Sequence, residues 1–194
     1  MSDFELIRRH LEERLAPPHS LLIERERIRQ AAVTLLLREE QGAAELFIIK
    51  RADREGDPWS GHLALPGGRA ELPDTDLMAT AARETHEEVG IDLLNGGVFI
   101  GQLPLIKPIA PRLPQIEITP LVALAPLSLS ICLSEEVDRV FWVPIGQLKR
   151  AGLSDVYARR FGELVRKWPA YASEDGPIWG ITERILTSFL SLLD

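Results

Sequence analysis

The sequence has one cysteine, no long apolar run and no excess of positive charge. The single cysteine, Cys132, excludes a disulfide within the chain and is typical of a reducing compartment. Because it lies in the apolar stretch LSLSICLS, we expect a buried structural thiol. The most apolar stretch, residues 119–133, is shorter than the ~20 residues of a transmembrane helix and contains Pro126. We therefore expect no membrane partner.

The charge pattern excludes further classes of protein. The first residues, MSDFELIRRHLEERL, are charged throughout and lack the apolar segment of an export signal, so we expect a cytoplasmic protein. The net charge of −7 argues against a nucleic-acid partner, because duplex-binding proteins usually carry a basic face. A small anionic substrate remains compatible with this charge, since a few local cations and a metal ion can attract it.

The order of apolar patterns predicts one domain of mixed α and β structure over residues 1–194. Helical spacing marks two additions to this domain, an N-terminal helix over about 3–15 and a C-terminal helix over about 180–193. Strands are predicted at 31–38, 45–51, 62–65, 98–103, 116–124 and 138–143, with the first two in a hairpin and a short helix at 144–150. The absence of regular βαβ alternation argues against a doubly wound sheet.

Three segments are less clear. Residues 151–177 show no simple pattern, and we expect part of them to be helical. The proline-rich residues 104–115 predict an irregular surface loop, a candidate substrate lid. Arg25, Arg27 and Arg29 precede the first strand and form either a solvated connector or a basic patch near an anionic ligand.

The strongest chemical signal is a predicted helix that Asp74, Thr75 or Asp76 caps and Gly90 ends. Three of its carboxylates share one face, because residues three and four apart lie together on a helix: Glu84, Glu87 and Glu88. Like charges at this spacing repel, and a hard cation such as Mg²⁺ or Mn²⁺ offsets the repulsion. A double glycine, residues 67–68, precedes the helix and lets backbone approach closely.

Residues 83–91 (RETHEEVGI), preceded by this double glycine, resemble the Nudix box. The spacing from the glycine pair to residue 83 is one residue longer than the box requires. Thr85 fills a position that is usually apolar, and the first glutamate of the box has no direct match, so that Asp74 or Glu71 stands there. The resemblance implies an α/β fold, the Nudix α/β/α sandwich with a mixed sheet.

One branch of this family, the coenzyme A diphosphatase-like hydrolases, carries the same extra residue. Its motif before the box is similar to Arg51-Ala52, then Gly61, then residues 65–68 (LPGG). Here the spacing from Arg51 to Gly61 is one residue longer, and Leu65 replaces a phenylalanine. Further similarities are Thr119-Pro120, residues 135–137 (EEV) and residues 179–182 (WGIT).

The resemblance implies metal-dependent hydrolysis of a pyrophosphate bond. It implies Glu84 and Glu88 as ligands of Mg²⁺ or Mn²⁺, joined by Glu87 and the carbonyl of Gly67. Glu87 or Glu88 would act as general base. Arg83 would orient a carboxylate or hold the glycine loop to the helix. Candidate distal bases are Glu136, Glu135 and Glu117, and candidate substrate-binding residues are Arg51, Lys50, Arg54 and Gly68.

The partner is then a small nucleotide-linked diphosphate. The branch implies coenzyme A or a derivative, cleaved to 3′,5′-ADP and 4′-phosphopantetheine. Alternative substrates are ADP-ribose, a dinucleotide or an oxidised nucleoside triphosphate. An alternative of another class is a non-catalytic Nudix module that binds a nucleotide. By analogy with relatives, the two terminal helices are candidate surfaces for a homodimer.

Overall fold

The computed structural model describes residues 1–18, 23, 29–108, 116–161 and 163–194. The elements in chain order are α1 (Asp3–Arg14), β1 (Arg29–Glu40), β2 (Ala43–Arg51), β3 (Leu63–Ala64), β4 (Gly67–Arg69), α2 (Leu77–Val89), β5 (Val98–Gln102), β6 (Ile116–Leu124), β7 (Val137–Pro144), α3 (Ile145–Ala151), β8 (Asp155–Phe161), β9 (Leu164–Tyr171), β10 (Ile178–Trp179) and α4 (Gly180–Ser191). The predicted strands and helices are thus confirmed up to residue 151, and the short strand β4 at the double glycine was not predicted.

The central sheet is mixed. Its strands follow the order β3-β2-β1-β6-β5, with β4 also paired to β1 and β7 to β2. Only β1 and β6 run parallel, and the other pairs are antiparallel. Along one edge β1 changes partner, from β4 at Ala31–Val33 to β2 at Leu37–Glu40. The glycine strand β4 is therefore held beside the middle of the sheet.

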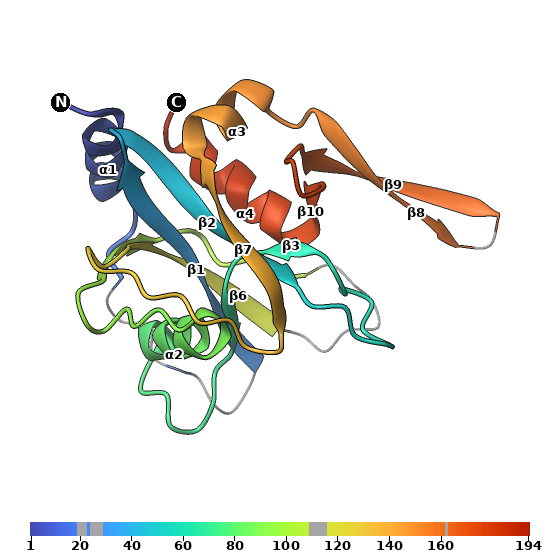
Figure 1. The fold of residues 1–194 in the computed structure, drawn as a ribbon, viewed down its shortest axis with the longest axis horizontal. Helices are drawn as coiled ribbons and strands as arrows, with labels where there is room; N and C mark the ends of the chain where they lie inside the picture. The colour runs from blue at the N-terminus through green and yellow to red at the C-terminus, as the bar shows by residue number, and fades with distance from the viewer. Residues whose placement is uncertain (19–22, 24–28, 109–115, 162) are drawn as a thin grey trace.

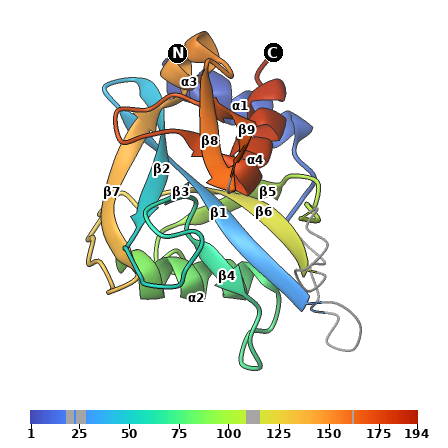
Figure 2. The same cartoon turned by 90° about the vertical axis from the view of Figure 1, so that its right-hand side faces the viewer.

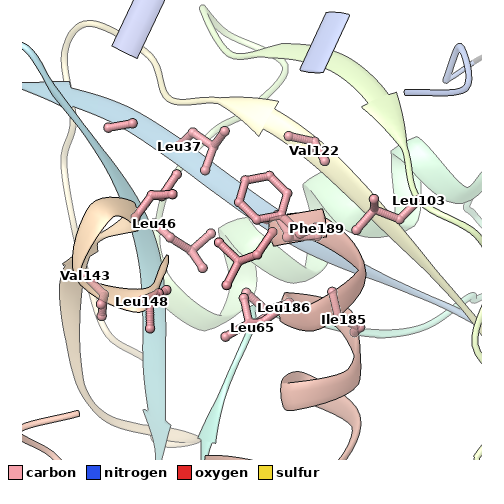
Figure 3. Close-up of a cluster of buried hydrophobic side chains, with 14 of the residues drawn as sticks. Leu37, Leu46, Leu65, Leu103, Val122, Val143, Leu148, Ile185, Leu186 and Phe189 are labelled. Atoms are coloured by element: carbon pink, nitrogen blue, oxygen red, sulfur yellow. The ribbon is translucent and has the colours of Figure 1, made fainter. Parts of the chain in front are cut away.

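Helices cover both faces of this sheet, as the α/β/α prediction requires. Helix α2 lies on one side, against β1, β4 and β6, while α1, α3 and α4 lie on the other (Figures 1 and 2). Alternate residues of each strand supply the two apolar layers, because successive side chains of a strand point to opposite faces. On the α4 side, Phe189 and Leu186 pack among Leu37, Leu46 and Val122 (Figure 3).

The local signals for the first hairpin and for α2 are confirmed. Gln41 and Gly42 have positive φ angles of 51° and 84°, the conformation that two-residue hairpin turns favour. Of the three candidate caps, Asp76 is the one that begins α2, and its side chain accepts a hydrogen bond from Ala79 N–H at 2.8 Å. Gly90 ends the helix in the left-handed conformation, φ 74°.

The helical prediction for residues 151–177 is wrong. The segment forms the hairpin β8–β9, which projects from the body of the molecule (Figure 1). Its strands are mostly exposed on both faces, so their sequence has no apolar alternation that would mark a strand. The base of the hairpin is anchored by Tyr157, whose ring stacks on Trp179 with centroids 3.8 Å apart.

The prediction for Cys132 is also wrong, because this thiol is exposed. It lies against the end of α2, where Cys132 N–H donates to Val89 O at 2.9 Å. Arg25, Arg27 and residues 109–115 of the predicted lid lie outside the described residues, and the lid stays a prediction. Within the described ranges, no helix has both the length and the apolar character needed to cross a bilayer.

Candidate active site

Helix α2 presents its carboxylates to the glycine strand β4. Buried apolar side chains pack the helix against the rest of the domain, among them Leu77, Ala81 and Val89. A side chain at either glycine of β4 would overlap its surroundings. At Gly67 the added atom would overlap backbone of β1, and at Gly68 it would overlap the carboxylate of Glu84. Gly67 therefore needs glycine so that β4 can lie against β1, whereas at Gly68 an added side chain would displace the Glu84 carboxylate.

Glu88 is the most buried carboxylate of the three. Its side chain is 6% exposed, and its Oε2 accepts a hydrogen bond from Gly67 N–H at 2.9 Å. Burial raises the pKa of Glu88 to about 7, and repulsion from Glu84 and Glu136 adds to the rise, against the opposing effects of Gly67 and Arg51. The buried charge of Glu88 is thus costly without a cation beside it.

Glu84 and Glu87 are held by one arginine. Arg83 Nη1 lies 3.0 Å from Glu84 Oε1 and 2.9 Å from Glu87 Oε2. Burial raises the pKa of Glu84 despite this pairing. Glu87 is more open, with 57% of its side chain exposed. The three predicted metal-binding carboxylates therefore line one face of α2, as their spacing indicates.

The same arginine fastens the loop before α2. Arg83 Nε and Nη2 each lie 3.0 Å from an oxygen of Asp74, and Nη2 also donates to Arg69 O at 2.9 Å. Asp74 is 4% exposed and further accepts from Glu71 N–H and Thr80 Oγ1. Although burial raises the pKa of Asp74, these hydrogen bonds hold it below its ordinary value. Asp74, not the exposed Glu71, occupies the position left open in the sequence.

The unusual Thr85 makes a buried polar contact. Its Oγ1 lies 3.0 Å from Thr34 Oγ1 on β1 and donates to Ala81 O at 2.7 Å. Both threonine side chains are fully buried. The position that is usually apolar in the box thus carries a hydroxyl, and this hydroxyl is hydrogen-bonded to Thr34 on the sheet.

A cavity of about 580 Å³ opens beside Glu88. The catalytic end is lined by Glu88, Gly67, Gly68 and Arg51, and the walls between the sheet and α4 are mainly apolar. Arg51 Nη2 is paired with Asp57 Oδ2 at 2.9 Å, while its buried Nε has no hydrogen-bond partner among the described residues. This unused donor beside a buried carboxylate marks a place for an anionic group next to a cation.

Other predicted site residues do not line the cavity. Lys50 Nζ lies 3.8 Å from Asp138, and Arg54 pairs with Glu136 at 3.1 Å. Among the distal-base candidates, Glu136 is the one close enough to influence Glu88. Glu117 is paired with a lysine of the preceding loop at 2.7 Å, and Glu135 is exposed.

Sequence reasoning missed two arginines of the cavity lining, Arg69 and Arg184. Arg69 directly follows the double glycine, which was an available signal. Arg184 lies in α4, far along the chain, and no local pattern identifies it.

The residues present suit a divalent cation. In the described ranges no three histidine, cysteine or acidic side chains already converge on one point. The donor set nevertheless consists of carboxylate oxygens, the chemistry that Mg²⁺ and Mn²⁺ prefer. Burial raises the pKa values of Glu84 and Glu88 despite their contacts with Arg83, Gly67 and Arg51, so a cation beside them would stabilise their charged forms.

Fold and site together define an α/β/α domain with a carboxylate-bearing helix beside a glycine strand. A sequence model of the NUDIX domain matches residues 28–163, more than half of the chain. The chain therefore belongs to the NUDIX domain family.

Individual relatives agree with this assignment. The chain is 33% identical over 163 residues to the Nudix hydrolase NudL of an Enterobacter species, covering 81% of this chain and 79% of that one. It is 28% identical over 172 residues to the mitochondrial coenzyme A diphosphatase NUDT8 of Homo sapiens, covering 87% and 71%. The chain spans between 32% and 64% of the length of several other curated relatives.

Solved structures confirm the fold. A MutT/nudix family protein from Enterococcus faecalis superposes with a TM-score of 0.58 at 20% identity, over 100% of this chain and 75% of that chain. The predicted Nudix sandwich is therefore confirmed.

Proposed function

We propose that this chain hydrolyses the diphosphate bond of a nucleotide-linked substrate, with coenzyme A or one of its derivatives preferred. The observation that carries the proposal is the meeting of Glu88 and Arg51 at one end of a cavity. A buried carboxylate whose pKa is raised and a guanidinium with an unused Nε both line this cavity. The first suits a divalent cation, and the second suits a phosphate.

Four groups would hold a Mg²⁺ or Mn²⁺ ion: the carboxylates of Glu84 and Glu88, then Glu87, and the carbonyl of Gly67. Such an ion supplies positive charge for the phosphates and acidifies a water molecule for attack on phosphorus. The glycine strand keeps the Gly67 backbone within hydrogen-bond distance of Glu88, at 2.9 Å. Arg83 keeps the side chains of Glu84 and Glu87 in place from the solvent side.

Side chains of the protein would accept the proton and bind the phosphate. Glu88 or Glu87 accepts the proton of the attacking water, and Glu136 is the distal alternative because it lies near Glu88. Arg51 binds a phosphate oxygen through the donors that Asp57 leaves free.

The shape of the cavity supports coenzyme A. Beyond the catalytic end, apolar side chains of β1, β3, β6 and α4 make up much of the lining, beside the arginines of these elements and of β4. A pantetheine arm is narrow and partly apolar, and about 580 Å³ lies within the roughly 300–1,000 Å³ of small-molecule sites. The similarity to a coenzyme A diphosphatase over 71% of that protein's length supports the same substrate class.

A substrate panel with Mg²⁺ and with Mn²⁺ tests the proposal. The panel contains coenzyme A, acetyl-coenzyme A, ADP-ribose, NADH and 8-oxo-dGTP. We expect the highest kcat/KM for the first two compounds, and loss of most turnover in Glu88→Gln. Glu13→Gln is the matched control, because Glu13 is an exposed carboxylate of α1.

Three other results would contradict parts of the proposal. Faster cleavage of ADP-ribose, NADH or 8-oxo-dGTP than of coenzyme A would refute the substrate preference. Absence of turnover for every compound would favour a binding module. Unchanged kcat of Glu88→Gln at saturating Mg²⁺ would remove this residue from the catalytic centre.

A further inference from the structure

Three arginines line the same cavity away from the carboxylate helix: Arg29, Arg69 and Arg184. All three are exposed, and none forms an ion pair with a carboxylate of the described residues. Most other cationic side chains around the active site are paired, for example Arg54 with Glu136 and Arg51 with Asp57. Three guanidinium groups without counter-ions at one cavity indicate an anionic ligand there.

Two of these arginines share one face of the sheet. Arg69 on β4 is the register partner of Ala31 on β1, and Arg29 lies two residues earlier on β1. Residues two apart in a strand point to the same face, so both side chains stand on the face that α4 covers. Ile116 and Ile118 of β6, the register partners of Arg29 and Ala31, form the apolar floor between them.

Helix α4 brings the third arginine to this end. Arg184 lies in its first turns, and its Nη1 donates to Lys107 O at 3.3 Å. Its neighbours on the helix, Ile181 and Ile185, line the apolar wall. Three separate elements, β1, β4 and α4, therefore place positive charge at one end of the cavity.

This end is separated from the catalytic end by more than a diphosphate. Gly67 is the register partner of Val33, and Arg29 lies four residues from Val33 on the same strand. At ~3.3 Å per residue, Arg29 is about 13 Å along β1 from the glycine beside Glu88, and Arg69 is about 7 Å along β4. Two directly joined phosphates span less than the distance to Arg29, whereas a phosphorylated ribose bridges it.

We infer that the Arg29–Arg69–Arg184 end binds a phosphate monoester of the substrate, distinct from the diphosphate that is cleaved. Guanidinium groups present planar forks that bind phosphate through two hydrogen bonds. The preferred substrate class is then a nucleoside diphosphate derivative that carries an additional phosphate on its ribose. The inference rests on the proposed function only for the position of the cleaved bond.

A binding experiment tests this arginine end without turnover. Isothermal titration measures 3′,5′-ADP against 5′-AMP in EDTA, because the two ligands differ only in the additional phosphate. We expect the wild type to bind 3′,5′-ADP at least tenfold more tightly, with this preference reduced about tenfold in Arg184→Gln and in Arg29→Gln. The double variant should show the smallest preference, with Arg69 as the remaining arginine of the three. Arg9→Gln is the matched control, since Arg9 is an exposed arginine of α1.

Two results would overturn the inference. One is equal affinity of the wild type for the two ligands. The other is a loss of affinity in the variants that is the same for both, or that Arg9→Gln reproduces. Circular dichroism and urea unfolding of each variant confirm that the fold is retained.

Kinetics separates this inference from the proposed function. Coenzyme A and 3′-dephospho-coenzyme A share the diphosphate bond, so Arg184→Gln should lower kcat/KM about tenfold more for coenzyme A. Equal kcat/KM for both substrates in wild type and variant would overturn the phosphate site and leave the proposed function standing. No turnover of either, with 3′,5′-ADP still preferred over 5′-AMP, would refute the hydrolase proposal and support the phosphate site.

Discussion

Replacing Glu88 with glutamine should stabilise the metal-free protein at pH 8. Glu88 is 6% exposed, and its pKa is raised from 4.5 to about 7, mainly by burial. Between these values the folded protein holds a proton that the unfolded chain releases. The contribution of Glu88 to the free energy of unfolding therefore falls as pH rises through this window and is lowest above pH 7.

The magnitude follows from the width of the window. At about 1.4 kcal/mol per pH unit, the interval from 4.5 to about 7 corresponds to a cost of about 3 kcal/mol for the ionised carboxylate. Most of this cost, about 2–3 kcal/mol, should develop between pH 5 and pH 8. Glutamine has no charge to bury and can still accept the hydrogen bond from Gly67 N–H. The variant therefore does not carry the cost of a buried ionised carboxylate.

Urea unfolding in EDTA at several pH values measures the effect. The free energy of unfolding of Glu88→Gln minus that of the wild type should increase by about 2–3 kcal/mol from pH 5 to pH 8. Using this difference removes the contributions of groups that both proteins share. Saturating Mg²⁺ should stabilise the wild type at pH 8 and have little effect on the variant.

Two results would refute the reasoning. A difference that is constant across pH would mean that Glu88 does not carry a raised pKa. Equal stabilisation of both proteins by Mg²⁺ would mean that the Glu88 carboxylate does not hold the ion. Glu13→Gln, at an exposed site, should follow the wild type in both measurements.

Three further substitutions test the contacts that hold the carboxylate helix in position. Arg83→Lys keeps the charge but loses the fork that reaches three carboxylates, so we expect about 2–4 kcal/mol lower stability by urea unfolding and weaker Mg²⁺ binding by titration. Gly68→Ala overlaps only the movable end of Glu84, so Mg²⁺ affinity should fall while the urea midpoint changes little. Thr85→Val should cost about 1–3 kcal/mol because it strands the Thr34 hydroxyl, and adding Thr34→Val should recover part of this loss in a double-mutant cycle.

The elements around the site could be predicted because their signals are local. The cap Asp76, the terminator Gly90 and the spacing of Glu84 and Glu88 depend on a few neighbouring residues, and the structure has each element where the pattern indicated. The hairpin β8–β9 could not be predicted in this way. Its exposed strands bury little apolar surface, so no alternation records the pairing, and its anchor to Trp179 joins residues distant in sequence.

The composition of the cavity was harder to predict for the same reason. Arg51 and the double glycine belong to recognisable motifs, and the structure places them together. Arg184 reaches the cavity only because α4 packs across the sheet, and Lys50 turns out to pair with Asp138. One residue of difference in a strand reverses the face of a side chain, so neighbouring cations in a sequence need not share a site.

The acidic residue before the helix, Asp74, pairs with Arg83 although it departs from the Nudix box. An aspartate is one methylene shorter than the glutamate of the box, and the loop that carries Asp74 is one residue longer. The result is a carboxylate that meets Arg83 with two contacts of 3.0 Å. That pairing matters for the chemistry because Arg83 also holds Glu84 and Glu87. With those two carboxylates partly neutralised, the uncompensated charge is concentrated on Glu88, where a cation has the most to gain. What the site requires is thus an acceptor at the guanidinium of Arg83, which Asp74 supplies.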